Sequence, residues 1–234
     1  MSPTSAWAEG RYSVALLVMT AATGAVDAVS YLSLDRVFTG NMTGNVLFLA
    51  FGLLGIEDIP VVNNLVALLT FMLGAVIGSR IVRRTAEPWH LPKHSVAVLI
   101  GTTAGTALVA IAWLIVGILP EHLLIVVTGV LALLLGAQAA AVKTVGIRDL
   151  STVVVTMTMV NLSTDSRLAG GKGADWLRRA LAIFAMGAGA FVGAILCIRG
   201  FGSWALVVAS AIMAIGTVLL VLARRREIAL SPSA

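Results

Sequence analysis

An acidic side chain, Asp27, lies inside an apolar run that covers residues 12–34. A carboxylate in the hydrocarbon of a membrane costs about 2.5–3.5 kcal/mol on insertion scales, so such residues usually face the interior of a helix bundle and have a function. Burial favours the protonated form of a carboxyl group, so Asp27 is a candidate proton carrier. Tyr31, one helical turn further on, can hydrogen-bond Asp27 or line the same cavity. The alternative is a buried polar contact that fixes helix packing.

The segment 38-FTGNMTGN-45 contains two asparagines, two threonines and two glycines, and it carries no charge. Apolar residues flank it on both sides. Non-helical backbone at membrane depth is tolerated only where protein or a water-filled cavity covers it. Gly40 and Gly44 let the chain turn and let other groups approach closely. The segment therefore indicates a break in the helical structure inside the membrane.

A short helix can begin at this break and continue through residues 46–54, with Asn41, Thr43 or Asn45 as its cap. The free N–H groups and partial positive charge of a helix start suit a carboxylate or another anion. The same residues can instead merely cap a short helix at the outer surface. In this half of the chain the candidate binding residues are Asp27, Tyr31, Thr39, Asn41, Thr43, Gly44 and Asn45.

A second short stretch, 151-STVVVTMTMVNLST-164, is less polar and rich in β-branched residues, so we expect it to run extended before any helix. Its candidate binding residues are Thr156, Thr158 and Asn161. Gln138 is a further candidate, because it falls near the position that corresponds to Asp27 in a later apolar run.

The composition excludes an ordinary soluble domain. Apolar residues make up 59% of the 234 residues, only 12% are charged, and the mean hydropathy is +1.01. Soluble domains carry about 25% charged residues. Crossing about 30 Å of hydrocarbon takes about 20 helical residues. Six apolar runs are long enough, namely residues 12–34, 61–82, 95–119, 122–146, 176–198 and 203–223, whereas residues 42–54 and 152–162 are too short.

The positive charges are distributed unevenly along the chain. With six spans and both termini in the cytoplasm, 14 of the 16 lysines and arginines fall inside, and only Arg36 and Arg199 fall outside. Such an excess is typical of cytoplasmic loops. The inside set is Arg11, Arg80, Arg83, Arg84, Lys93, Lys143, Arg148, Arg167, Lys172, Arg178, Arg179, Arg224, Arg225 and Arg226. The basic composition therefore indicates topology and contact with anionic lipid, not a nucleic-acid partner.

The halves on either side of Pro120 contain a weak repeat. Gly24 corresponds to Gly136 at a separation of 112 residues, and the glycine pair 74 and 78 corresponds to the pair 189 and 193 at 115 residues. Three spans per half is an odd number, so the second half enters the membrane from the opposite side, as in the inverted repeats of many transporters. We assign residues 12–119 and 122–223 to the two repeats of a single membrane domain, residues 1–234.

The glycine pairs Gly74, Gly78, Gly189 and Gly193 have the Gly-x-x-x-Gly spacing. Small residues at this spacing let helix backbones pack closely in a membrane. We expect these four glycines to be helix-packing positions, either within the chain or between copies of it.

The stretch 24-GAVDAVSYLSLDRVFTGNMTGN-45 resembles the YoaK family of bacterial multi-pass membrane proteins. The residues that carry the resemblance are Gly24, Asp27, Ser30, Tyr31, Phe38, Thr43, Gly44 and Asn45. The hydropathy pattern of the whole chain is also similar. The resemblance implies a bacterial cytoplasmic (inner) membrane protein with about six helices, and it implies importance for Asp27 and the Thr-Gly-Asn triplet without assigning them a role.

The fold class we expect is an all-α integral membrane protein, with about six transmembrane helices, two short re-entrant or half-helix segments and a 3+3 inverted repeat. The predicted function is a small secondary transporter or permease for a small polar or anionic solute, with proton coupling through Asp27. The alternatives are a structural or regulatory membrane protein without transport, a passive channel and a membrane-embedded enzyme.

We expect no enzymatic activity, because the chain contains neither His-Glu-x-x-His nor Gly-x-Ser-x-Gly. The single cysteine, Cys197, excludes a multi-cysteine metal site, and the three histidines, His90, His94 and His122, lie in or beside loops. We therefore expect no metal and no cofactor. The expected partners are the lipid bilayer, a small-molecule solute and a second copy of the chain.

Overall fold

The computed structural model of the protein describes residues 3–56, 58–83, 91–147, 150, 152–153 and 155–230. His90, Arg84 and Arg148, named above, lie outside this part of the chain. The described residues form eight α-helices and two short 3-10 helices and contain no β-strand. The α-helices are α1 (Pro3–Ser33), α2 (Met42–Leu53), α3 (Val61–Val82), α4 (Lys93–Val116), α5 (Glu121–Val142), α6 (Val155–Thr164), α7 (Trp176–Ile198) and α8 (Gly202–Leu230), and the 3-10 helices are η1 (Lys143–Val145) and η2 (Arg167–Ala169).

Six of these helices, α1, α3, α4, α5, α7 and α8, are long and apolar enough to cross a membrane. They coincide with the six predicted spans, and the prediction of an all-α membrane protein with two additional short helices is confirmed. The helices α1 and α8 extend beyond the predicted bounds, to Pro3 and Leu230. Apolar length defines only the part of a helix within hydrocarbon, and helix-forming polar residues continue it into water.

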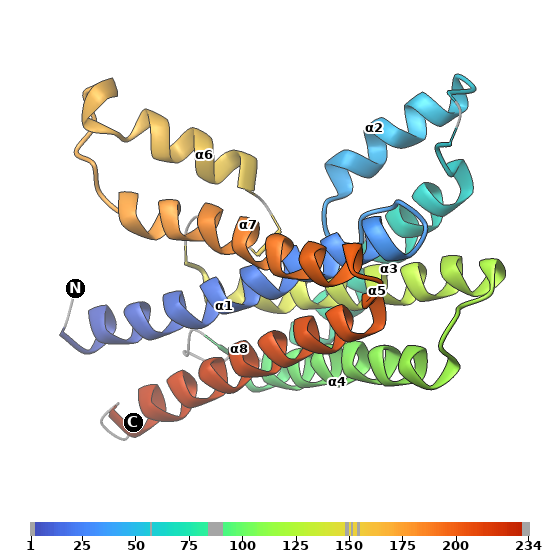
Figure 1. The fold of residues 1–234 in the computed structure, drawn as a ribbon. Coiled ribbons are helices and arrows are strands. Elements are labelled where there is room, and N and C mark those ends of the chain that lie inside the picture. Colours follow the sequence, from blue (N-terminus) through green and yellow to red (C-terminus); the bar gives the residue numbers. More distant parts are fainter. Residues whose placement is uncertain are drawn as a thin grey trace.

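The long helices form a bundle in which α1 packs along α7 and α8, α3 packs along α5, and α4 packs along α8. The apolar stretch of α1 is the most buried of the six. Tyr12 at the start of α1 donates a hydrogen bond to Glu227 near the end of α8, at 2.8 Å. The beginning of α1 and the end of α8 therefore lie at the same end of the bundle (Figure 1).

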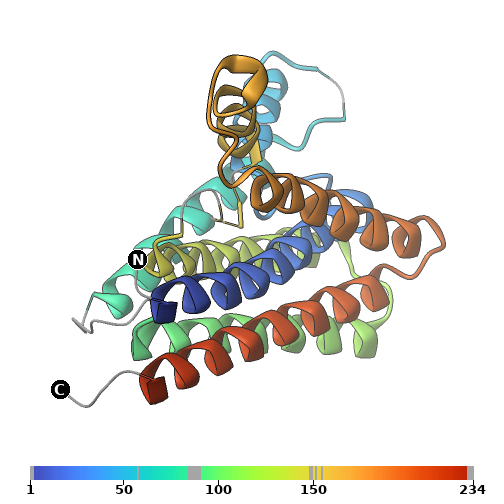
Figure 2. The ribbon, with the colours of Figure 1, turned by 90° about the vertical axis from the view of Figure 1, so that its left-hand side faces the viewer.

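The short helices α2 and α6 have 12 and 10 residues. At 1.5 Å per residue they span about 18 and 15 Å, roughly half of the hydrocarbon thickness. Both begin close to the bundle and diverge from it in opposite directions (Figure 1). A view turned by 90° shows both on the same side of the bundle (Figure 2). Neither helix can cross a membrane by itself.

Glycines allow α3 to touch the backbone of α5. A Cβ atom at Gly74 would collide with the backbone of Leu133, and one at Gly78 would lie 2.8 Å from the carbonyl oxygen of Ala137. Real Cβ atoms do not approach so closely, so a larger residue at either position would push the helices apart.

The same arrangement joins α7 to α1. A Cβ atom at Gly189 would collide with the backbone of Ala21, and one at Gly193 would lie 2.8 Å from the carbonyl oxygen of Ala25. The contacted residues of α5 follow those of α1 by 112 positions, and the glycines of α7 follow those of α3 by 115. The structure thus places all four predicted packing glycines at contacts within the chain.

Candidate functional site

A pocket of about 990 Å³ lies where the first turns of α2 and α6 meet the sides of α1 and α7. Most of its lining is apolar. The polar side chains that line it are Asp27, Tyr31, Asn41, Thr43 and Thr156. Five predicted binding residues, from α1 and from the starts of both short helices, therefore share one pocket.

Asp27 is 6% exposed, and its carboxylate holds the segment that precedes α2. The Oδ1 atom accepts hydrogen bonds from the Thr39 N–H at 3.0 Å, the Thr39 hydroxyl at 3.3 Å and the Gly40 N–H at 2.6 Å. Hydrogen bonds to a charged acceptor are about twice as strong as neutral ones. Asp27 therefore positions the start of α2 as well as lining the pocket.

Position 40 leaves little room for a side chain beside this carboxylate. A Cβ atom on Gly40 would lie 3.0 Å from the Thr23 methyl group and 3.2 Å from Asp27 Oδ2. Gly40 thus allows the close approach that the sequence predicted. Asp27 lies six residues before the end of α1, which is about 9 Å along the helix axis. Because Gly40 contacts Asp27, the chain folds back alongside α1 to this level after the helix ends.

Asn45 is fully buried and binds the backbone of Phe38 with both of its polar groups. The Asn45 Oδ1 atom accepts from the Phe38 N–H at 3.0 Å, and Asn45 Nδ2 donates to the Phe38 carbonyl at 2.6 Å. The Asn45 side chain thus joins the first turn of α2 to Phe38 and closes the loop between them. The structure places Asn45 beneath that loop, outside the set of pocket-lining residues.

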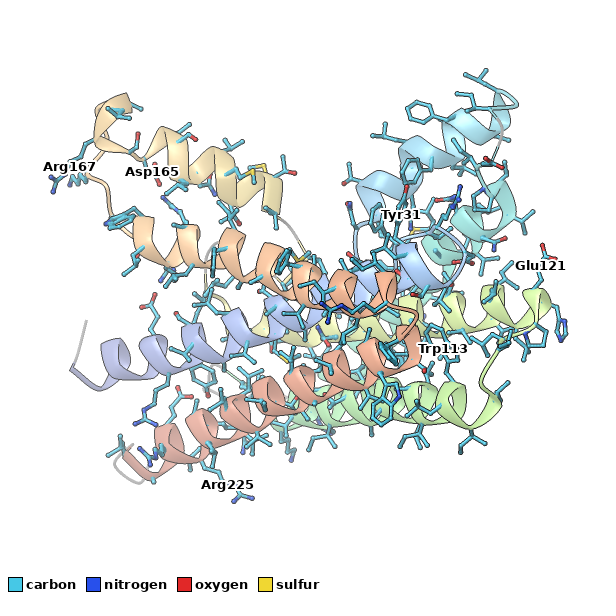
Figure 3. The ribbon with its side chains drawn as sticks, viewed as in Figure 1. Tyr31, Trp113, Glu121, Asp165, Arg167 and Arg225 are labelled. Atoms are coloured by element: carbon cyan, nitrogen blue, oxygen red, sulfur yellow. The ribbon has the colours of Figure 1, made fainter. Side chains whose placement is uncertain are left out.

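Three aromatic rings stack between α1 and α2. The ring centroids of Tyr31 and Phe38 are 4.9 Å apart, and Phe48 lies 6.0 Å from Tyr31. A Cβ atom on Gly44 would be 3.0 Å from the Phe38 ring, so a glycine here leaves room for the stack. Tyr31 lies beside α2 (Figure 3) and lines the pocket, but it makes no hydrogen bond to Asp27.

The start of α2 has few free donors. Asn41 is the N-cap, and of the three predicted cap candidates it is the one whose side chain accepts from the Gly44 N–H, at 3.3 Å. The Asn45 N–H donates to the Asn41 carbonyl, and the Met42 N–H donates to the Gly40 carbonyl. Within the described residues the Thr43 N–H is left without a partner, and Thr43 lines the pocket.

The start of α6 is built differently. Thr152 is buried and has a φ of 63°, in the left-handed region, and α6 begins at Val155. The prediction that this stretch runs extended is wrong for its described residues, because residues 152 and 153 are bends and the chain is helical from Val155. Thr156 lines the pocket, and Thr158 is 2% exposed, on a buried side of α6.

The far end of α6 is tied to α7. Arg179, which is 8% exposed, donates to the Asn161 carbonyl at 2.9 Å and forms an ion pair with Asp165 at 2.7 Å. The Asn161 backbone thus has a structural contact, and Asn161 is not among the residues that line the pocket.

Gln138 lies in the core of the bundle, fully buried, outside the pocket lining. Its Nε2 atom donates to the Thr23 hydroxyl at 3.4 Å. Its Oε1 atom has no hydrogen-bond partner in the described part of the chain.

Asp35 anchors the chain just after α1. Its carboxylate accepts hydrogen bonds from Asn63 Nδ2 and from the Thr128 hydroxyl, both at 2.7 Å. Burial raises the pKa of the Asp35 carboxyl, while the hydrogen bonds from Thr128 and Asn63 oppose this shift. The loop before α2 is therefore fixed at Asp35 to α3 and α5 and at Thr39 to α1.

Sequence reasoning missed the wall that α7 contributes. Met186, Ala190 and Phe191 line the pocket opposite the predicted residues. The run of small residues in α7 could have indicated that this helix also borders a pocket, but we interpreted it only as a helix-packing face. Of the residues that line the pocket within the described chain, Asp27 alone is charged.

The family model described as "Protein of unknown function (DUF1275)" matches residues 15–219. The chain belongs to this family. A relative of this DUF1275 chain is "UPF0700 transmembrane protein YoaK" from Bacillus subtilis (strain 168), which is 33% identical over 159 residues. The alignment covers 65% of the chain and 65% of the relative's length. No solved structure matches. The predicted resemblance to the YoaK family is confirmed, and the chain is a multi-pass membrane protein.

Proposed function

We propose that this DUF1275 protein is a small secondary transporter or permease for a small polar solute, with proton coupling through Asp27. The observation that carries the proposal is the pocket in which both short helices begin beside a buried carboxylate. In transporters with broken helices, the starts of half-helices commonly form the substrate site near the membrane midplane. Binding here needs no cofactor, and we propose no enzymatic reaction.

An inverted repeat is part of this proposal. Its support is the pair of glycine contacts, α3 on α5 and α7 on α1, which recur at the same sequence separations. In this reading α2 and α6 are re-entrant segments from opposite faces, and residues 12–119 and 122–223 are the two repeats. The return of Gly40 to the depth of Asp27 supports a re-entrant α2.

The pocket chemistry favours a neutral polar solute over a free anion. Tyr31, Asn41, Thr43 and Thr156 supply uncharged donors and acceptors. No lysine or arginine lines the described pocket, and an ionised Asp27 repels an anion. An anionic solute therefore fits only when Asp27 is protonated, which would couple its entry to a proton.

Protonation of Asp27 would also weaken the three hydrogen bonds that Oδ1 accepts from Thr39 and Gly40. Those bonds hold the loop before α2. The proton would thus loosen one wall of the pocket, which is the coupling step we propose.

A structural role without transport is the second candidate. It is favoured by one observation, that Asp27 and Asn45 both bind the loop before α2. In that case the pocket would be filled by lipid, and loss of Asp27 would affect only stability.

The decisive experiment uses purified protein and a panel of neutral amino acids, polyols and short monocarboxylates. A ligand at 100 times its dissociation constant should stabilise the protein by about 2.7 kcal/mol. Solutes that raise the melting temperature are then tested for uptake into proteoliposomes with an inward proton gradient. Thr43→Val should weaken binding, and Asp27→Asn should abolish the dependence on the gradient.

Thr164→Val is the matched control, because Thr164 lies at the exposed end of α6 and does not line the pocket. It should behave like the wild-type protein. If no solute stabilises the protein and Asp27→Asn is merely less stable, the structural candidate replaces the transporter.

We also propose that the chain lies in the bacterial inner membrane with both termini in the cytoplasm. The support is the charge distribution, with Arg225 and Glu121 at opposite ends of the bundle (Figure 3). In a Cys197→Ala background, Asp58→Cys and Lys172→Cys should react with an impermeant thiol reagent from opposite sides. Labelling of both from one side would reject the six-span topology.

A further inference from the structure

A second pocket, of about 880 Å³, lies at the other end of α6, around η2 and the start of α7. It shares no lining residue with the first pocket. Its lining combines apolar side chains with hydroxyl groups and one cation. The lining residues are Leu162, Ser163, Ser166, Arg167, Leu168, Ala169, Gly173 and Trp176.

Arg167 is the charged side chain of this pocket, and within the described chain it has no ion-pair partner. The nearby acids are already paired: Asp165 with Arg179 at 2.7 Å and Asp175 with Arg178 at 3.1 Å. Arg167 lies at the outer end of this segment (Figure 3), and it is exposed. It is therefore available to an anion from outside the chain, and a guanidinium binds phosphate oxygens in a bidentate manner.

Ser166 supplies a second donor. Its Oγ atom accepts from the Ala169 N–H at 3.3 Å, which leaves its own O–H free to donate. The Ser163 hydroxyl, in contrast, donates to the Met159 carbonyl at 2.9 Å. One guanidinium and one hydroxyl thus face the same pocket.

Exposed apolar residues flank these donors. Leu168 is fully exposed and Trp176 is 58% exposed. Trp176 is the first residue of α7, one of the candidate spans, so the pocket opens at a membrane surface. Tryptophan is enriched at that level, where its ring is apolar and its N–H meets the headgroups.

We propose that this pocket binds the phosphate headgroup of an anionic phospholipid. Arg167 and Ser166 donate to the phosphate oxygens, while Leu168 and Trp176 contact the glycerol and upper acyl chain. The apolar flanks favour a lipid over inorganic phosphate, because a free phosphate ion gains nothing from contact with leucine or tryptophan. The site does not depend on whether the first pocket transports a solute.

The test uses delipidated full-length protein in a neutral detergent. Short-chain phosphatidylglycerol is titrated in mixed micelles, with phosphatidylcholine as the comparison lipid, and the melting temperature is followed. We expect phosphatidylglycerol to raise the melting temperature more than phosphatidylcholine does. Arg167→Gln should weaken the apparent affinity about tenfold or more, because a hydrogen bond to a charged group is lost.

Lys172→Gln is the matched control. Lys172 lies in the same segment and carries the same charge, but it does not line the pocket, so its loss should change the affinity by less than about twofold. Leu168→Ser should weaken lipid binding and leave any binding of inorganic phosphate unchanged. Arg167 and Leu168 are exposed, and neither substitution removes a buried contact.

Three outcomes would overturn the proposal. Equal weakening by Arg167→Gln and Lys172→Gln would indicate diffuse attraction of basic residues to anionic lipid. Equal effects of the two lipids would exclude recognition of the anionic headgroup. Displacement of the lipid by millimolar inorganic phosphate would make the site one for free phosphate.

Discussion

Among the contacts of the described residues, those that hold α2 to the bundle lie at its start, whereas those that hold α6 through Arg179 lie at its end. Asp27 and Asn45 bind the loop that leads into α2, and Asn41 caps its first turn. For α6 the described anchors lie at its end, where Arg179 binds Asp165 and the Asn161 carbonyl.

The two halves of the proposed repeat differ at the position of Asp27. The residue of α5 that corresponds to Asp27 at a separation of 112 is Ala139, which has no polar side chain. At this position α5 therefore offers no carboxylate that could accept hydrogen bonds from the segment before α6. Among the described residues that line the pocket, Asp27 is the acidic one, and it holds the start of α2. The wall formed by α2 should therefore respond to protonation differently from the wall formed by α6.

The largest expected effect is that of Asp27→Ala. The substitution leaves the Thr39 and Gly40 N–H groups buried without an acceptor. We expect the free energy of unfolding to fall by about 3 kcal/mol or more, measured by denaturant titration in detergent. Asp27→Asn keeps an acceptor and should cost less, and Glu121→Gln, at an exposed position, should cost little. An Asp27→Ala protein as stable as the wild type would show that α2 is not anchored there.

Arg179→Gln should release α6 alone. The loss of a charged hydrogen bond to the Asn161 carbonyl should cost about 2 kcal/mol. We expect faster amide hydrogen exchange in residues 155–164 and unchanged exchange in residues 42–53. Arg178→Gln is the control, because Arg178 pairs with Glu9 and Asp175 and not with α6. If the amides of residues 155–164 exchange equally slowly in Arg179→Gln and Arg178→Gln, Arg179 does not anchor α6.

Asn41→Ala should have a smaller effect, confined to the first turn of α2. Loss of an N-cap acceptor typically costs about 1 kcal/mol. Amide exchange at Gly44 should speed up, because the Asn41 side chain accepts from that N–H. Asn41→Ser, which retains a capping oxygen, should restore most of the protection. Unchanged exchange at Gly44 in Asn41→Ala would refute the cap.

The smallest effect concerns pH and Asp35. The folded protein raises the pKa of this carboxyl, so the folded state binds its proton more tightly than the unfolded state does. Stability should therefore fall as the pH rises from about 4, the unfolded value, through the raised folded pKa. Asp35→Asn should remove that part of the pH dependence. Identical profiles of unfolding free energy against pH in the two proteins would argue against the shift.

The sequence predicted the spans and the two short helices well, because the length of an apolar run is a local property that hydrocarbon thickness tests directly. The close approach at Gly40 was also predicted from local chemistry, and one of the three cap candidates, Asn41, is the N-cap. These features depend on few residues near one another in the chain.

The partners of polar side chains could not be predicted in the same way. Asn45 was expected in a binding site, since its amide suits a solute as well as a backbone, and only the fold reveals that Phe38 occupies both of its groups. Arg179 was interpreted as one of several cytoplasmic charges. Its contact with Asn161 depends on how α6 returns against α7, which no local pattern encodes.

The glycine contacts determine which parts of the molecule can move. Close backbone contact at the glycines opposes sliding of one helix along the other, so we expect α1 with α7 and α3 with α5 each to move as a unit. Between these two pairs of helices α1 meets α5 only sparsely. There Gln138 Nε2 makes a long hydrogen bond of 3.4 Å to the Thr23 hydroxyl, and its Oε1 atom has no partner among the described residues. This weakly bonded seam is the plane along which we expect the bundle to shear.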